Sequence, residues 1–215
     1  MGSIIVITII FIGFLAGLIV NIQQETKGYL RIFPWFLLLT LVVEVTAYYL
    51  FLKGEPPITL YNFFTSFEFL FYVYILREIV QNKQVKKIIF NVLWLYLVLL
   101  ILNFLFIQKI AAFKSITYAI GCLLIVAISI YYFYELFQLP HSGNLSMQPA
   151  FWICSGLLFF YTCSFPIYGL TNFVKKAPSV ILKNIGLFII VLNVLLYSSF
   201  TIALLCRLRT RKSTP

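Results

Sequence analysis

The sequence predicts an all-α polytopic membrane protein with seven transmembrane helices. Three observations carry this prediction: 62% of the 215 residues are hydrophobic, only 10% are charged, and the apolar residues fall into seven long stretches. Soluble domains are roughly 45–50% apolar and about 25% charged, so the composition excludes an ordinary soluble domain. Each stretch holds the ~20 mainly apolar residues that a helix needs to cross the hydrocarbon core.

The predicted spans follow one another with short connections. We expect residues 1–206 to form a single bundle, followed by a short basic cytoplasmic tail, 207–215. The first stretch lacks the charged start and the cleavage site of a secretory signal, so we expect it to remain as the first helix. The spans cover about residues 3–22, 33–52, 58–77, 88–108, 116–137, 149–171 and 184–206.

Prolines and charged residues mark the boundaries of these spans. A proline is tolerated at the start of a helix or in a loop, where its missing N–H removes no helical hydrogen bond. A Lys or Arg is excluded from the membrane centre by its charge. In chain order, the markers are Lys27 and Arg31, Pro34, Pro56–Pro57, Arg77 with Lys83, Lys109 with Lys114, Pro149, and Pro178 with Lys183.

The distribution of basic residues predicts the orientation. Loops on the cytoplasmic side of a membrane protein carry an excess of Lys and Arg. An N-out/C-in topology places ten of the sixteen bases inside and six outside, so we expect that topology. The inside bases would be Lys27, Arg31, Arg77, Lys83, Lys86, Lys87, Arg207, Arg209, Arg211 and Lys212, and the outside bases Lys53, Lys109, Lys114, Lys175, Lys176 and Lys183.

Several established chemistries lack their residues in this sequence. The only histidine, His141, falls in a predicted loop, and the four cysteines show no CxxC spacing, so we expect no metal site. No GxSxG, HExxH or phosphate-binding glycine loop occurs, so we expect no catalytic residues and no cofactor. The net charge of +10 is interpreted as a topology signal, and no nucleic-acid partner is expected.

Two glutamates within the predicted spans are the most informative residues. Glu44 lies eight residues before the end of the second span, and Glu68 lies ten residues after the start of the third. A short turn joins these spans, so the two carboxyls are expected at similar depth. No Lys or Arg occupies the centre of a span, and an ionised acid there costs at least ~2.5–3.5 kcal/mol. We therefore expect at least one carboxyl to be protonated near neutral pH, or a bound cation to compensate the pair.

Polar side chains share the helix faces of the two acids. Those neighbouring the acids recur at the spacing of helical turns, and those of other helices could converge on a central cavity. The alternative interpretation is that the hydroxyls form hydrogen bonds between helices, often worth only about 0.6 kcal/mol each. The candidate residues for binding a ligand or a proton are Glu44, Glu68, Tyr48, Tyr72, Thr40, Thr65, Asn193 and Tyr197.

Short apolar motifs also carry a resemblance. They are Glu44, the Leu60-Tyr61-Asn62-Phe63-Phe64 segment with Glu68, and the Phe151-Trp152-Ile153 segment leading to Gly156 and Tyr161. In this pattern the chain resembles small, uncharacterised seven-helix membrane proteins of Bacteroidota-type bacteria. The resemblance implies a multi-pass protein of the bacterial inner membrane and supplies no activity.

Three functions remain open at this point. The first is a non-enzymatic sensor or ligand-binding bundle, in which a proton, a cation or a small amine engages the acids. The bundle would signal through a cytoplasmic or membrane partner protein, because the tail is too short to be an output domain. The second is a small proton- or cation-coupled transporter, although no internal repeat is evident. The third is an accessory subunit that serves as a membrane platform.

A reporter fused to the C-terminus tests the predicted orientation. We expect a reporter that works only in the cytoplasm to be active there, because four bases in residues 207–215 favour the inside. Activity of a reporter that works only outside the cytoplasm would contradict the N-out/C-in topology.

Overall fold

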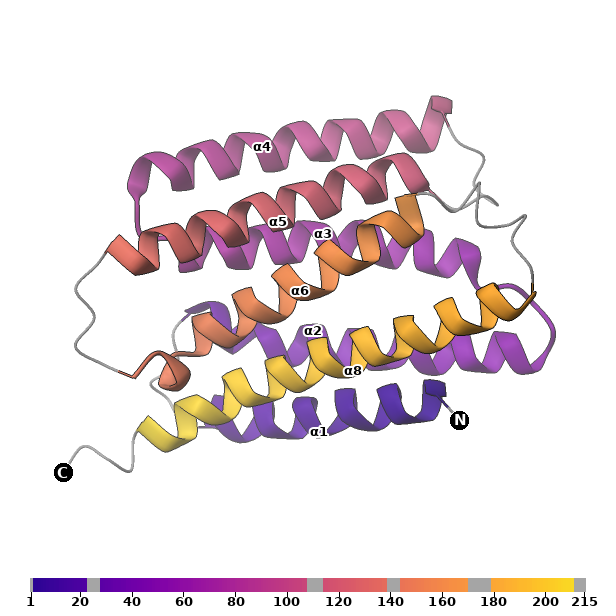
Figure 1. Ribbon diagram of the computed structural model, residues 1–215, viewed down its shortest axis with the longest axis horizontal. Coiled ribbons are helices and arrows are strands. Elements are labelled where there is room, and N and C mark those ends of the chain that lie inside the picture. The colour runs from indigo at the N-terminus through magenta and orange to yellow at the C-terminus, as the bar shows by residue number, and fades with distance from the viewer. Residues whose placement is uncertain (1, 23–27, 108–113, 139–143, 170–178, 211–215) are drawn as a thin grey trace.

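The computed structural model describes residues 2–22, 28–107, 114–138, 144–169 and 179–210, and this part of the chain is helical with no strand (Figure 1). Seven of its helices are long and apolar enough to cross a membrane, which confirms the all-α prediction and supports a membrane protein. The elements are α1 (Gly2–Ile22), α2 (Gly28–Leu52), α3 (Ile58–Ile79), α4 (Lys83–Leu102), the π-helical η1 (Asn103–Ile107), α5 (Ser115–Gln138), the 3-10 helix η2 (Leu145–Met147), α6 (Pro149–Gly169) and α8 (Ser179–Thr210).

Three helices extend beyond the spans that the sequence predicts. Helix α4 begins at Lys83 instead of at about residue 88. Helix α2 begins at Gly28 instead of at about residue 33, so Pro34 lies inside the helix and not in its first turn. Helix α8 begins at Ser179 and continues through Thr210, into the residues expected to form the tail. The apolar window shows which residues can lie in hydrocarbon, but a helix continues into flanking polar sequence where its backbone is still hydrogen-bonded. Residues 211–215 lie outside the described residues.

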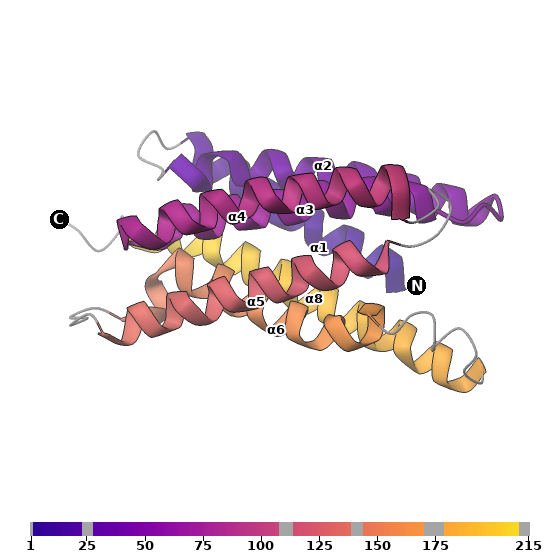
Figure 2. The same cartoon turned by 90° about the horizontal axis from the view of Figure 1, so that it is seen from above.

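Six of the helices form a closed ring. Around the ring, α1 packs on α2, α2 on α3, α3 on α5, α5 on α6, α6 on α8, and α8 again on α1. Helix α4 lies outside the ring and packs on α3 and α5. Figure 2 shows α2, α3 and α4 on one side of the bundle and α5, α6 and α8 on the other. The ring surrounds an interior toward which side chains of six helices can point.

Glycines allow the closest contacts in this ring. A Cβ placed on Gly17 would lie 2.6 Å from Cγ of Pro34, and one placed on Gly13 would lie 2.8 Å from Oγ1 of Thr201. These two glycines, four residues apart on α1, therefore let one helix approach both α2 and α8. Small residues at such positions are typical of helix contacts in membranes.

A polar cluster joins α4 and η1 to the rest of the bundle. Nζ of Lys114 donates to the carbonyl oxygen of Asn103 at 3.3 Å and lies 4.6 Å from the ring centroid of Phe104. The backbone N–H of Lys114 donates to Oδ1 of Asn62 at 3.1 Å. The sequence places Lys114 in a loop, and the residue directly precedes α5, where it is only 3% exposed. The carbonyl oxygen of Asn103 and the ring of Phe104, both in η1, lie beside its ammonium group.

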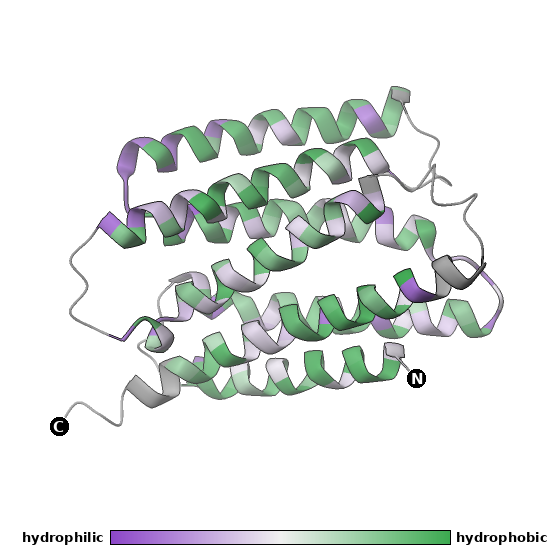
Figure 3. Cartoon of the chain, viewed as in Figure 1, coloured by the Kyte–Doolittle hydropathy of each residue, from purple (hydrophilic) through white to green (hydrophobic). Residues whose placement is uncertain are grey.

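Large apolar side chains cover the outside of the bundle. Figure 3 shows hydrophobic residues along the length of the helices and hydrophilic ones concentrated near several helix ends, most clearly at the start of α4. Such a surface suits contact with lipid hydrocarbon. Its most exposed members include Ile22, Phe51, Leu52, Leu105, Phe106 and Phe137.

Replacing Gly17 by alanine tests the contact between α1 and α2. We expect Gly17→Ala to lower the free energy of unfolding by about 1–3 kcal/mol, because the new methyl group would overlap the Pro34 ring. The measurement is thermal unfolding of the purified protein in detergent.

The matched control is Gly186→Ala on α8, where a Cβ would meet nothing within 4 Å. This variant should be unchanged or up to about 1 kcal/mol more stable, since alanine favours a helix over glycine. Equal stability of Gly17→Ala and the wild type would contradict the packing of α1 on α2.

Candidate functional site

The two predicted acids face one cavity inside the helix ring. Glu44 comes from α2 and Glu68 from α3, and both side chains line a cavity of about 320 Å³. At ~1.5 Å per helical residue, Glu44 lies about 12 Å from the end of α2, and Glu68 about 15 Å from the start of α3. Ser3 and Ile58, in the first turns of their helices, also line the cavity. The cavity therefore extends from the end of the bundle where α1 begins to about the middle of the helices.

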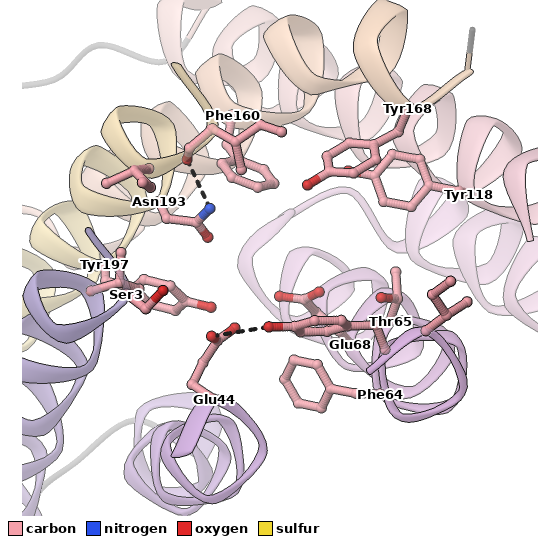
Figure 4. A pocket seen from close by; sticks show the side chains of 15 residues that line it. Ser3, Glu44, Phe64, Thr65, Glu68, Tyr118, Phe160, Tyr168, Asn193 and Tyr197 are labelled. Atoms are coloured by element: carbon pink, nitrogen blue, oxygen red, sulfur yellow. Dashed lines mark hydrogen bonds between the residues drawn. The ribbon is translucent and has the colours of Figure 1, made fainter. Parts of the chain in front are cut away.

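The wall of the cavity is mostly apolar and aromatic. Ten of the fifteen lining residues are aliphatic or aromatic, and none of the lining residues that the structure describes is a lysine, an arginine or a histidine. Figure 4 shows the acids and the rings around this space. The lining residues are Ser3, Val6, Glu44, Ile58, Tyr61, Phe64, Thr65, Glu68, Tyr118, Phe160, Tyr168, Ile189, Ile190, Asn193 and Tyr197.

Each acid accepts a hydrogen bond from a tyrosine of α3. The hydroxyl of Tyr61 donates to Oε2 of Glu44 at 3.3 Å, and the hydroxyl of Tyr72 donates to Oε1 of Glu68 at 3.0 Å. Among the described residues neither acid forms an ion pair; the ion pair found there joins the adjacent side chains of Arg77 and Glu78. The two carboxyls are thus oriented by neutral donors, and their charge is not balanced by the described side chains.

Three further predicted residues lie where the sequence placed them, in the wall around the acids. Thr65 is on α3, within one turn of Glu68, and Asn193 and Tyr197 face the cavity from α8. Nδ2 of Asn193 donates to the carbonyl oxygen of Ile189 at 2.9 Å. This bond holds the amide so that its own oxygen turns toward the cavity (Figure 4). The structure thus brings these three residues to the cavity that the acids line, and their part in binding stays a prediction.

The structure places the other three predicted residues outside the wall. Thr40 is fully buried, and its hydroxyl donates to the carbonyl oxygen of Phe36 at 2.9 Å, so its hydrogen bond is made within its own helix. Tyr48 is half-buried on α2 and does not line the cavity. Tyr72 is fully buried behind Glu68 and supports that acid through its hydroxyl. Periodicity identifies a helix face, but the neighbouring helices decide which residues of that face reach an open space.

Sequence reasoning left several aromatic wall residues out of the site. Tyr61 shares the helix face of Thr65 and Glu68, and its position one turn earlier was the available signal. Tyr168 and Phe160, on α6, carry no local signal, because an aromatic residue in an apolar span is usually a packing residue. Their contribution depends on the packing of α6 beside α5 and α8.

Aromatic rings close the inner end of the cavity. On α2 and α3, the two helices that carry the acids, this aromatic floor lies farther from the opening than Glu44 and Glu68 do. The centroids of Phe33 and Phe200 are 5.0 Å apart, and those of Tyr72 and Tyr161 are 6.0 Å apart. The floor consists of Phe33, Phe36, Tyr72, Tyr161 and Phe200, and none of these side chains is more than 3% exposed.

A second cavity, of about 540 Å³, lies at the opposite end of the bundle, where α3 ends and α4 begins. Its acids are already engaged: Glu78 pairs with Arg77, and both oxygens of Glu135 accept backbone N–H groups, from Gln81 at 2.8 Å and Asn82 at 2.7 Å. Glu135 thereby fixes the turn between α3 and α4. The cavity with Glu44 and Glu68 is the stronger candidate site, because its acids have no such partners among the described residues.

Comparison with protein-family models, curated proteins and solved structures finds no match for this chain. The geometry of the cavity is therefore what indicates a function.

Removing the hydroxyl of Tyr72 tests whether its hydrogen bond to Glu68 stabilises the protein. We expect Tyr72→Phe to lower the free energy of unfolding by about 0.5–1.5 kcal/mol, because it deletes a buried hydrogen bond. Thermal unfolding in detergent measures the change. Tyr74→Phe is the matched control, since Tyr74 is an exposed tyrosine on the same helix. An equal effect of the two variants would contradict a supporting role for Tyr72.

Proposed function

We propose that the protein is a non-enzymatic integral membrane receptor that binds a small cation between Glu44 and Glu68. The observation that carries this proposal is the position of both acids in one cavity without a cationic partner among the described residues. Binding of the cation would be passed to a partner protein. The ligand would be a proton, a cation or a small amine.

Electrostatics favour a cationic ligand. An ionised carboxylate within the bilayer is costly, and a second one beside it adds like-charge repulsion. A cation bound between Glu44 and Glu68 would remove both costs at once. The tyrosine hydroxyls on the two acids supply neutral hydrogen bonds, which orient the carboxylates without cancelling their charge.

The closed inner end favours a receptor over an open pathway. The aromatic floor separates this cavity from the one at the opposite end. Leu76, Ile125 and Leu157, all fully buried, add an apolar layer between the two. A ligand could therefore enter and leave from one end only in this conformation. With the N-out/C-in topology that the loop charges predict, that end would face the outside of the inner membrane.

The chain needs a partner to produce a response. The basic segment 207–215, at the proposed cytoplasmic end, can bind anionic lipid or another protein. Ligand binding would change the packing of α2, α3 and α8, the three helices that carry Glu44, Glu68 and Asn193. A membrane or cytoplasmic protein in contact with these helices would receive the signal.

A second candidate function is a small cation- or proton-coupled transporter. The observation that favours it is the presence of cavities at both ends of one bundle. A carrier would have to move the aromatic floor so that the acids become accessible from the other side.

Neutralising each acid tests the proposed site. We expect Glu44→Gln and Glu68→Gln each to weaken the binding of methylammonium by about tenfold or more, because each removes a charged acceptor. Binding is measured by calorimetry on the full-length protein in nanodiscs. Glu55→Gln is the matched control, since Glu55 is exposed in the turn between α2 and α3. Equal binding by all three variants would contradict a cation site at these acids.

A flux assay separates the receptor from the transporter. In proteoliposomes with a pH-sensitive dye, a receptor should move no protons or methylammonium above the background of empty liposomes. Flux that Glu44→Gln or Glu68→Gln abolishes would identify a transporter. Unchanged behaviour of both variants in the binding and flux assays would instead favour a membrane-platform subunit.

A further inference from the structure

We infer that the ligand is a protonated primary amine carrying one apolar alkyl or arylalkyl substituent. This inference rests on the proposed cation site and names its ligand class. The cavity offers charge at its inner part and apolar surface nearer its opening, and it has room for more than a single ion. Each of these three features excludes a different group of cations.

Polarity changes along the length of the cavity. Glu44, Glu68 and Asn193 lie near the middle of their helices. Closer to the opening, the wall is formed mainly by Val6 and Ile58, by Ile189 and Ile190 on α8, and by tyrosine rings, with Ser3 as a polar exception. A ligand that matches this gradient has a charged head that reaches the acids and an apolar portion that points toward the opening.

The volume indicates a molecule of moderate size. The cavity, of about 320 Å³, falls at the lower end of the range for small-molecule sites, which is roughly 300–1,000 Å³. It corresponds to roughly ten waters at about 30 Å³ each. A bare metal ion or ammonium would leave most of this space to water beside an apolar wall. An amine with about ten non-hydrogen atoms would fill it.

The polar groups at the inner part are mostly hydrogen-bond acceptors. The carboxylates of Glu44 and Glu68 can accept, and the amide oxygen of Asn193 turns toward the same space (Figure 4). A protonated primary amine has three N–H donors for such groups. A quaternary ammonium has none, so it would leave these acceptors unpaired in a poorly hydrated site, at a cost. The acceptors therefore favour an amine that retains N–H groups.

The apolar opening disfavours hydrated inorganic cations. A sodium or potassium ion would lose water as it passes Ile58 and Ile189, and the described side chains of that region offer few oxygen ligands in return. An alkyl or aryl group instead gains from burial on the same surface. The aromatic walls add an attraction for the cationic end, because a ring face is negative.

Calorimetric titration of the full-length protein in nanodiscs tests the inference. The ligands are methylamine, propylamine and 2-phenylethylamine. 2-Phenylethanol is the neutral counterpart of 2-phenylethylamine, and (2-phenylethyl)trimethylammonium is its quaternary counterpart. Empty nanodiscs of the same lipid composition correct for partition of the larger amines into lipid.

We expect affinity to rise about fourfold for each methylene buried, so that 2-phenylethylamine binds most tightly. It should bind roughly tenfold or more tightly than 2-phenylethanol, since only the amine makes charged hydrogen bonds with the acids. Glu68→Gln should lose this preference for the amine, and Glu55→Gln should retain it.

A second variant, Ile189→Trp, tests the apolar part of the cavity. It should weaken the binding of 2-phenylethylamine by a larger factor than the binding of methylamine, because the larger side chain narrows the apolar part of the cavity. Thermal unfolding of each variant in the absence of ligand confirms that it is folded.

The outcomes separate this inference from the proposed function. Equal affinity for methylamine and 2-phenylethylamine, both dependent on Glu68, would overturn the apolar substituent and leave the cation site standing. Binding of (2-phenylethyl)trimethylammonium as tight as that of 2-phenylethylamine, or tighter, would overturn the requirement for N–H groups. A third outcome is that neither the amines nor sodium or potassium bind in a way that depends on Glu44 or Glu68. That result would overturn both the inference and the proposed function.

Discussion

Every polar group inside a bilayer must find its partner within the protein, and this constraint organises the bundle. The helices satisfy their own backbones, and hydroxyls such as those of Thr40 and Thr201 donate to the carbonyl one turn earlier. A carboxyl group cannot be satisfied in that way, because an ionised acid offers no donor and needs several. Glu44 and Glu68 therefore lie toward the interior of the ring, where tyrosine hydroxyls reach them.

The helix ring that brings the two acids together also closes their cavity at its inner end. Close contacts at Gly13 and Gly17 bring α1 against both α2 and α8 and so close the ring. Once the ring is closed, bulky aromatic side chains meet below the acids, as Phe33 and Phe200 do. A site with a charged interior, an aromatic floor and an apolar opening follows from this packing. Such a site suits a ligand that is itself charged at one end and apolar at the other.

The features that sequence reasoning located share a local cause. Long apolar stretches predict helices of membrane length, and the cost of a buried charge identifies Glu44 and Glu68 without any knowledge of neighbours. Helical spacing selected Thr65, which lines the cavity, but the same spacing also selected Tyr48, which does not. Spacing defines a face about one helix axis. How far that face extends toward an open space depends on helices that are distant in the sequence.

The sequence by itself determined the class of protein, the number of long helices and the two acids, because hydrophobicity and charge act on each segment independently. The tertiary structure decided which side chains share a space with those acids, and it buried Lys114, which the sequence treated as a loop charge. It also decided that Tyr168 of α6 would contribute to the wall. These outcomes depend on the order of helices around the ring, which is set by close contacts between distant segments and not by the composition of any one segment.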